Sequence, residues 1–284
     1  MVTEEPGNLS NLSTSESVYA CVGGFLFMTH RYLSGRLAGA AAVALVALGI
    51  PSLASSATKE TERVEKTIPF TSGGTLKLKN FSGTVEITGD ERSDIALVAI
   101  RTAPRDRLDR IKLDIQSSGD TVTIDANKRD DSWHEKDDNV VETAFTLRMP
   151  ATANLDIDVF SSAVTVTGVS GRHHVHGFSS ELTLRDTTGP VDAETFSGAI
   201  HVAPASWVKD QSLRAKTFSG DIEVRLPQAA GGNLEFDSFS GDIQSDMPLT
   251  LRSKSKRSLR AQLSTGQTGE LNFKTFSGDV RLLK

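Results

Sequence analysis

The chain has very few of the residues that build disulfide frameworks and aromatic binding grooves. Among its 284 residues there are one cysteine (Cys21), two tryptophans and two tyrosines. A single cysteine excludes a disulfide within the chain and a metal site built from several thiolates. The shortage of Trp and Tyr also disfavours a groove that stacks sugar rings.

Positive charge is not in excess either. The formal net charge is −5, whereas a nucleic-acid-binding protein would show a basic face. We therefore expect no nucleic-acid partner. The sequence contains no nucleophile elbow, phosphate-binding loop, zinc-protease helix or dinucleotide fingerprint. We expect no cofactor and a noncatalytic protein.

The longest apolar run, Leu37–Ile50, has 14 residues, which is short of the roughly 20 that a membrane-spanning helix needs. Basic residues precede it after Met28, and small residues follow it, as in an export signal. We predict that residues 28–57 are a signal peptide, with an untranslated or disordered leader at 1–27 and a polar linker at 58–65. An uncleaved N-terminal anchor is the alternative. The mature protein is expected to be periplasmic, on the cell surface or secreted.

One short motif, Phe-Ser-Gly followed by an alternating strand, recurs through the chain. Its successive copies from residue 160 on lie 18–22 residues apart, except for a last step of 37, and serine replaces glycine at Ser162 and Ser180. A fixed period near 20 is typical of a solenoid. The expected repeat corners are Phe81 with Gly83, Phe160, Phe178, Phe196 with Gly198, Phe218 with Gly220, Phe239 with Gly241, and Phe276 with Gly278.

Each copy of the motif predicts one rung of a parallel β-solenoid. Apolar residues lie five and three positions before the Phe and four and six positions after it, as at Leu213, Ala215, Ile222 and Val224. This change of parity requires a corner between two strands, which Ser and Gly permit. We expect the Phe rings to fill the corner as core. An exposed, binding aromatic stripe is the less favoured alternative, because soluble monomers avoid large apolar patches.

Outward positions two and four residues before each Phe form columns of charged residues. Opposite charges on neighbouring strands contribute about 0.2–1 kcal/mol each, so we expect these columns to fix the register. Charge reversal at Lys216 should then destabilise more than reversal at Lys209. The expected neighbours are His174 with Asp192, Glu194 with Lys216, Asp192 with Arg214, and Arg214 with Glu235.

The remaining segments extend this plan. Residues 66–150 are predicted to form an N-terminal β-sheet region ahead of a solenoid at 151–284. Residues 127–139 are predicted to be a solvated charged loop, with a calcium site as the alternative, and residues 258–264 to be a repeat without a corner. The strand at 281–284 would be an uncapped edge, which permits end-to-end self-association.

Two groups of residues could carry chemistry. His174 and His176 share the outward face and are weak candidates for a metal site, for which Asp156, Asp158, Asp192 or Glu194 would have to supply a third ligand. We favour surface residues instead. Asp192 and Glu194 could also serve as the carboxylate pair of a polysaccharide-acting enzyme, and the basic turn at 252–260 could contact anionic groups.

Residues 66–284 resemble the bacterial "putative adhesin" family of exported β-strand-repeat proteins. The resemblance lies in Leu-Lys-Leu-Lys-Asn-Phe-Ser-Gly-Thr-Val-Glu-Ile at 76–87, Phe-Thr-Leu-Arg-Met-Pro at 145–150, and Thr-Phe-Ser-Gly-Asp at 217–221 and 275–279. It implies the repeat architecture and provides no catalytic residues. We therefore predict an exported, noncatalytic, adhesin-like β-solenoid of the envelope or cell surface that binds an envelope protein or a glycan. A polysaccharide-acting hydrolase or lyase of β-helix type is the alternative.

Overall fold

The computed structural model describes residues 58–128, 140–263 and 268–284, which lie within one compact unit, Ser55–Lys284. The predicted leader, signal peptide and most of the charged loop, including Trp133 and His134, fall outside the described residues. The elements of the first half are β1 (Lys59–Pro69), β2 (Thr75–Asp90), β3 (Asp94–Pro104), α1 (Arg105–Arg110), β4 (Lys112–Ser118), β5 (Thr121–Lys128), β6 (Glu142–Pro150), β7 (Asn154–Thr167), β8 (His173–Ser179) and β9 (Leu182–Thr187).

The second half consists of strands alone in its described part. They are β10 (Val191–Ser197), β11 (Ile200–Pro204), β12 (Gln211–Ser219), β13 (Ile222–Arg225), β14 (Gly232–Ser238), β15 (Ile243–Ser245), β16 (Leu249–Lys254), β17 (Ser258–Leu263), β18 (Gly269–Ser277) and β19 (Val280–Leu283). The predicted all-β class and solenoid architecture are confirmed.

A single rung shows how the sequence produces the fold. In β12 the alternating residues Leu213 and Ala215 are buried, and after the corner Ile222 and Val224 of β13 are buried in turn. The chain turns at Gly220, whose φ is 152°. A Cβ atom there would lie 2.1 Å from the carbonyl oxygen of Gly198 in the rung below. Only glycine fits both the backbone angle and this close stacking of successive corners.

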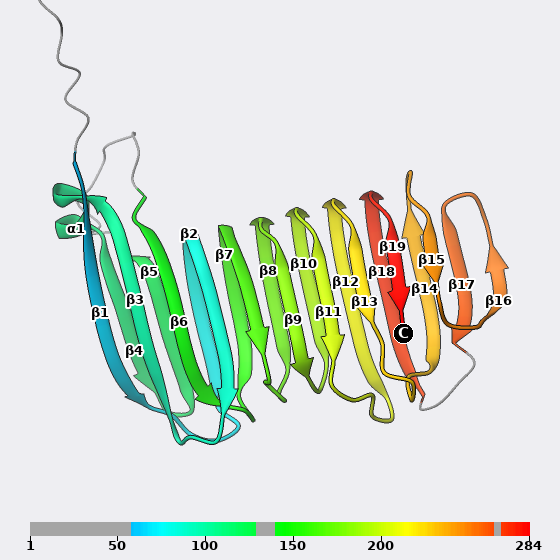
Figure 1. Cartoon of the computed structure of the whole chain (residues 1–284), viewed down its shortest axis with the longest axis horizontal. Helices are drawn as coiled ribbons and strands as arrows, with labels where there is room; N and C mark the ends of the chain where they lie inside the picture. Colours follow the sequence, from blue (N-terminus) through cyan, green and yellow to red (C-terminus); the bar gives the residue numbers. More distant parts are fainter. Residues whose placement is uncertain (1–57, 129–139, 264–267) are drawn as a thin grey trace, which may run out of the picture. The chain divides into compact units, whose positions relative to one another are not determined.

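Stacking the rungs produces two walls that share one apolar core. We call the wall formed before the corner the first wall; its strand order is β4–β5–β2–β7–β8–β10–β12–β18–β14–β17–β16. The second wall has the order β1–β3–β6–β2–β7–β9–β11–β13–β19–β15. Strands β2 and β7 run through the corner and belong to both walls. Figure 1 shows the strands side by side from β1 to β16.

The rungs do not follow one another in chain order throughout. The final rung, β18–β19, lies between β12–β13 and β14–β15 and pairs in parallel with both neighbours. Our expectation that Arg214 lies beside Glu235 was therefore wrong, since Asn272 stands between them in the register. The other three predicted neighbour pairs are confirmed.

Antiparallel strands close the two ends of the stack. At the N-terminal end β3 pairs antiparallel with β1 and β6, and β4 pairs antiparallel with β5. At the other end β17 runs antiparallel to β14 and β16, so the prediction that residues 258–264 form another repeat was wrong. The expected free edge at 281–284 was also wrong, because β19 is paired on both sides. The outermost strand there is β16, which carries Arg252 and Lys254, and charged edges of this kind oppose strand-to-strand association.

Candidate binding surface

The seven motif Phe residues form one continuous stack along the corner of the solenoid. Neighbouring ring centroids are 4.6–5.0 Å apart and the ring planes differ by 3–13°. This spacing matches the distance between hydrogen-bonded strands. We call this row the Phe stripe; its spatial order is Phe81, Phe160, Phe178, Phe196, Phe218, Phe276 and Phe239.

The Phe stripe lies on the surface, so the expectation that these rings fill the core was wrong. Six of the seven Phe residues are 42–49% exposed, and Phe81 is partly exposed. The reason is that β12 continues through Phe218 to Ser219. Phe218 therefore keeps the alternation of the first wall and points outward, and the parity changes only at the following Ser-Gly.

The space inside the corner is occupied by the residue before the Phe at every rung except that of Phe178, where Gly177 has no side chain and Ser180 lies there instead. The hydroxyl of Thr195 donates to the carbonyl oxygen of Ser180 at 3.1 Å, and that of Thr217 donates to the carbonyl oxygen of Gly198 at 3.3 Å. These bonds satisfy backbone acceptors at the corner, where buried polar groups need partners. The recurring Thr before Phe at 195, 217 and 275 is the sequence signal that indicates an outward ring.

Ring faces within the stripe are covered by neighbouring rings. Each interior ring stacks on both sides, which leaves its edge as the exposed part. At one end the guanidinium carbon of Arg257 lies 4.1 Å from the centroid of Phe239, a cation–π contact that covers the terminal face. The surface offered to a partner is thus an apolar ridge of ring edges.

Charged columns flank the stripe on both sides. On the first wall, two residues before each Phe, the spatial order is Lys79, Asp158, His176, Glu194, Lys216, Lys274 and Asp237. On the second-wall side, three residues after each Phe, it is Thr84, Ala163, Glu181, Ala199, Asp221, Asp279 and Asp242. The second flank is thus acidic over the last three rungs, whereas the first is mixed.

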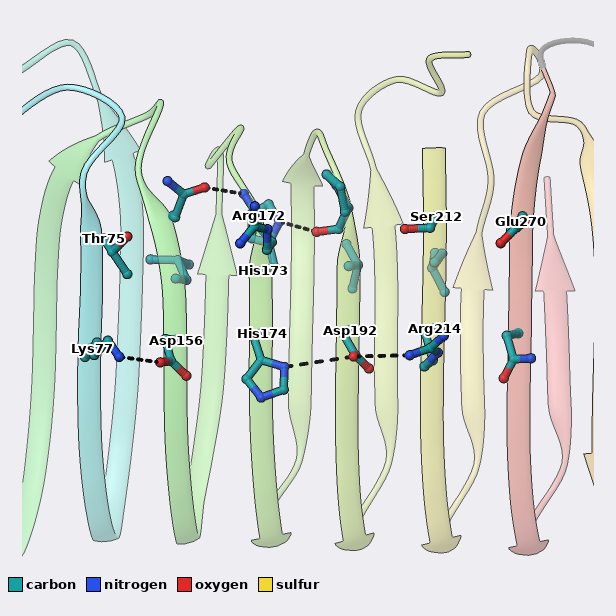
Figure 2. Close-up of a pocket in the computed structure, with 16 residues that line it drawn as sticks. Thr75, Lys77, Asp156, Arg172, His173, His174, Asp192, Ser212, Arg214 and Glu270 are labelled. Carbon is teal, nitrogen blue, oxygen red and sulfur yellow. Dashed lines mark hydrogen bonds and ion pairs between the residues drawn. The ribbon is translucent and has the colours of Figure 1, made fainter. Parts of the chain in front are cut away.

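A shallow groove of about 580 Å³ lies on the outer face of the first wall. Figure 2 shows its polar residues in rows across neighbouring strands. Lys77 Nζ lies 3.4 Å from Asp156 Oδ2, and Asp192 Oδ2 lies 3.7 Å from Arg214 Nη1 and 4.0 Å from His174 Nδ1. Five of the groove's polar side chains therefore pair with a neighbour across the strands.

The metal candidates do not converge on a common site. His174 faces Asp192, whereas His176 Nδ1 lies 3.4 Å from Asp158 Oδ1 in the next column. Within the described ranges, no three His, Cys, Asp or Glu side chains are grouped to hold a metal ion. Both histidines belong to the charged columns.

The carboxylates proposed for an enzyme are likewise engaged with cations. Glu194 Oε2 accepts a hydrogen bond from Lys216 Nζ at 3.2 Å, and Asp192 faces Arg214. In the same outward column as Asp192, a hydrogen bond from Arg260 lowers the pKa of Glu235. A general acid needs the opposite shift.

These features define a repeat protein of stacked two-strand rungs with an aromatic ladder on its surface. The chain belongs to the Toastrack DUF4097 family, because the sequence model of that family matches residues 57–283. The sequence matches none of the curated proteins with which it was compared. No helix in the described part is long and apolar enough to cross a membrane.

Several solved structures resemble the chain at low sequence identity. A "putative cell adhesion protein" from Clostridium sporogenes is 10% identical with a TM-score of 0.43, over 78% of this chain and 99% of that one. A "putative adhesin" from Bacteroides fragilis is 10% identical with a TM-score of 0.36, over 80% and 99%. A "putative lipid binding protein" from Parabacteroides distasonis is 9% identical with a TM-score of 0.25, over 81% and 98%.

Proposed function

We propose that this chain is an exported, noncatalytic scaffold of the cell envelope or surface that binds a protein partner through the Phe stripe. The observation that carries the proposal is the exposure of 42–49% in six stacked Phe residues. With about 200 Å² per Phe side chain, the stripe exposes about 600 Å² of apolar surface, the upper end for a soluble monomer. Surfaces of that size commonly mark interaction sites.

The geometry of the rings favours a protein over a glycan. Sugars stack on the faces of aromatic rings, and the faces of the interior Phe residues are already covered by their neighbours. Ring edges can instead pack against apolar side chains of another protein. The charged flanks would form the polar rim that protein interfaces usually have.

Site-specific photo-crosslinking in the producing cells tests the proposal. A photo-reactive phenylalanine analogue at Phe196 should crosslink to one protein, identified by mass spectrometry, whereas the same analogue at the exposed Lys209 should not. Equal crosslinking at both positions would contradict a role for the stripe. The predicted export is tested separately, by fusing residues 28–57 to a reporter enzyme that is active only outside the cytoplasm.

A glycan array and a reducing-sugar release assay on residues 55–284 test the alternative function, a polysaccharide-acting enzyme. The noncatalytic proposal expects no sugar release. Release that Asp192→Asn or Glu194→Gln abolishes would instead establish a polysaccharide-acting enzyme.

A further inference from the structure

The partner that fits the Phe stripe must match a straight apolar ridge with two unlike flanks. Six centroid steps of 4.6–5.0 Å extend the ridge over nearly 30 Å. A stable interface needs about 800 Å² from each partner. This is more than the stripe alone exposes, so the flanking columns must take part. A partner with the same straight ridge could match it over this whole length.

The charges beside the stripe are complementary to each other within a rung. At the rung of Phe218 the first-wall flank carries Lys216 and the second-wall flank carries Asp221; at the next rung the flanks carry Lys274 and Asp279. Lys216, Lys274 and Asp279 are partly or fully exposed, and Asp221 is fully exposed. Within the chain, the two lysines contact Glu194 and Asp237, and one oxygen of each aspartate accepts a backbone N–H of the neighbouring rung. The two flanks still present opposite charges at the surface.

Two copies can meet stripe to stripe in two symmetric ways. With a two-fold axis parallel to the stripe, the stripes run in the same direction and each first-wall flank faces the partner copy's second-wall flank. Lys216 then faces Asp221 and Lys274 faces Asp279, twice each. The only like-charged contact, Asp237 with Asp242, falls at the terminal rung.

With a two-fold axis perpendicular to the stripe, the stripes run in opposite directions. Each first-wall flank then faces the partner copy's first-wall flank, and each second-wall flank faces the partner copy's second-wall flank. The terminal pairs, such as Lys79 with Asp237, are then favourable. At the centre, however, Glu194 meets Glu194 and Glu181 meets Asp221. Because the centre of an interface is the most desolvated part, like charges there are costly.

Resting on the proposed function of the stripe, we propose that the partner is a second copy of this chain, packed stripe to stripe with the two stripes parallel. The dimer buries the Phe edges and pairs the lysine flank of each copy with the aspartate flank of the other. It leaves the groove on the outer face of the first wall open to solvent except near the stripe.

Sedimentation equilibrium on residues 55–284 tests the association. The wild-type protein should form a dimer, and Phe196→Lys should weaken it at least tenfold, while Val208→Lys, at an exposed apolar residue away from the stripe, should not. Lys274→Glu and Asp279→Lys should each weaken the dimer, and the double swap should restore it. Circular dichroism would establish that each variant is folded. A monomeric wild type, or a dimer insensitive to Phe196→Lys, would overturn the proposal.

Disulfide trapping tests the direction of the two copies, because residues 55–284 contain no cysteine. Ser161 and Ser277 follow Phe160 and Phe276 and are exposed. Parallel stripes bring each of these residues next to the same residue of the partner copy. Ser161→Cys alone and Ser277→Cys alone should therefore each form disulfide-linked dimers. Dimers formed only when the two variants are mixed would indicate opposite directions and overturn the proposal. Crosslinking from position 196 to a different protein would also overturn it, while leaving the proposed function intact.

Discussion

Phe276 stacks on Phe218 with 4.6 Å between their ring centroids, although 58 residues separate them in the chain. The last rung of the sequence is therefore an interior rung of the solenoid. Its apolar residues Leu271, Phe273, Val280 and Leu282 are at most 1% exposed. The C-terminal segment joins the rung of Phe218 to the rung of Phe239, and no other described strand does so.

Removing residues 268–284 should consequently unfold strands beyond the removed segment. Four fully buried side chains contribute about 1.5–3 kcal/mol each, which together approaches the whole stability of a typical domain, about 5–15 kcal/mol. We expect the truncated protein to lose β14–β17 as ordered strands, seen as fast amide hydrogen exchange, and to unfold at a much lower urea concentration. Removing only the exposed Lys284 is the control. An unchanged urea midpoint after the long truncation would contradict the inserted rung.

Alanine substitution at two glycines with positive φ should separate the destabilising effect of steric crowding from that of the backbone angle. Gly220 (φ 152°) has a carbonyl oxygen 2.1 Å from the position of a Cβ, whereas Gly119 (φ 60°) has nothing within 4 Å. Gly119→Ala should cost about 1–2 kcal/mol through its backbone angle alone. Gly220→Ala should cost about 3 kcal/mol or more, because strain and a clash with the next rung combine. Urea denaturation measures both, and equal losses would show that the corners are not tightly stacked.

Charge reversal should have unequal effects within the outward columns. Asp192 lies between His174 and the cation Arg214, whereas Lys216 lies between Glu194 and a like charge, Lys274. Asp192→Lys should therefore destabilise by about 1 kcal/mol. Lys216→Glu loses one favourable neighbour and gains another, so its effect should be close to that of Lys209→Glu. This revises the sequence-based expectation that Lys216 is the more sensitive lysine. A large loss at Lys216 would contradict the observed rung order.

The sequence predicted the rung but not the order of the rungs. Alternation around Phe218 defines two strands and a corner because burial requires it locally. Whether the rung of Phe239 or that of Phe276 follows next depends on packing among rungs with the same pattern. Local periodicity does not distinguish between Leu234 and Leu271 as the neighbour of Leu213.

The exposed Phe stripe was only the less favoured prediction, for a different reason. Each Phe stands where two alternations meet, and it can be assigned to the strand before it, which points it outward, or to the strand after it, which points it inward. General avoidance of exposed apolar patches favoured the inward choice. In the structure the hydroxyl of Thr217 occupies the space inside the corner. The ring of Phe218 must therefore point outward.

A buried histidine should make the protein less stable in mild acid. His173 is fully buried, its register neighbours are Leu155 and Val191, and its Nδ1 lies 3.4 Å from the carbonyl oxygen of Pro190. Burial lowers the pKa of His173, although hydrogen bonds to the backbone of Pro190 and Val169 oppose the shift. The ring thus stays neutral in the folded protein at a pH where the unfolded chain, with a pKa of about 6.5, binds a proton.

The stability that depends on a neutral His173 is present above pH about 6.5 and is lost as the pH falls towards the lowered pKa of the folded state. One additional proton bound by the unfolded chain lowers the free energy of unfolding by at most about 1.4 kcal/mol per pH unit. Urea denaturation between pH 7 and pH 5 should show a smaller decline for His173→Leu than for the wild type, since leucine occupies the equivalent positions 155 and 213. His201→Gln, at a partly exposed ring, should keep the wild-type decline. If His173→Leu declined as steeply as the wild type, protonation of His173 would not be the cause of the acid sensitivity.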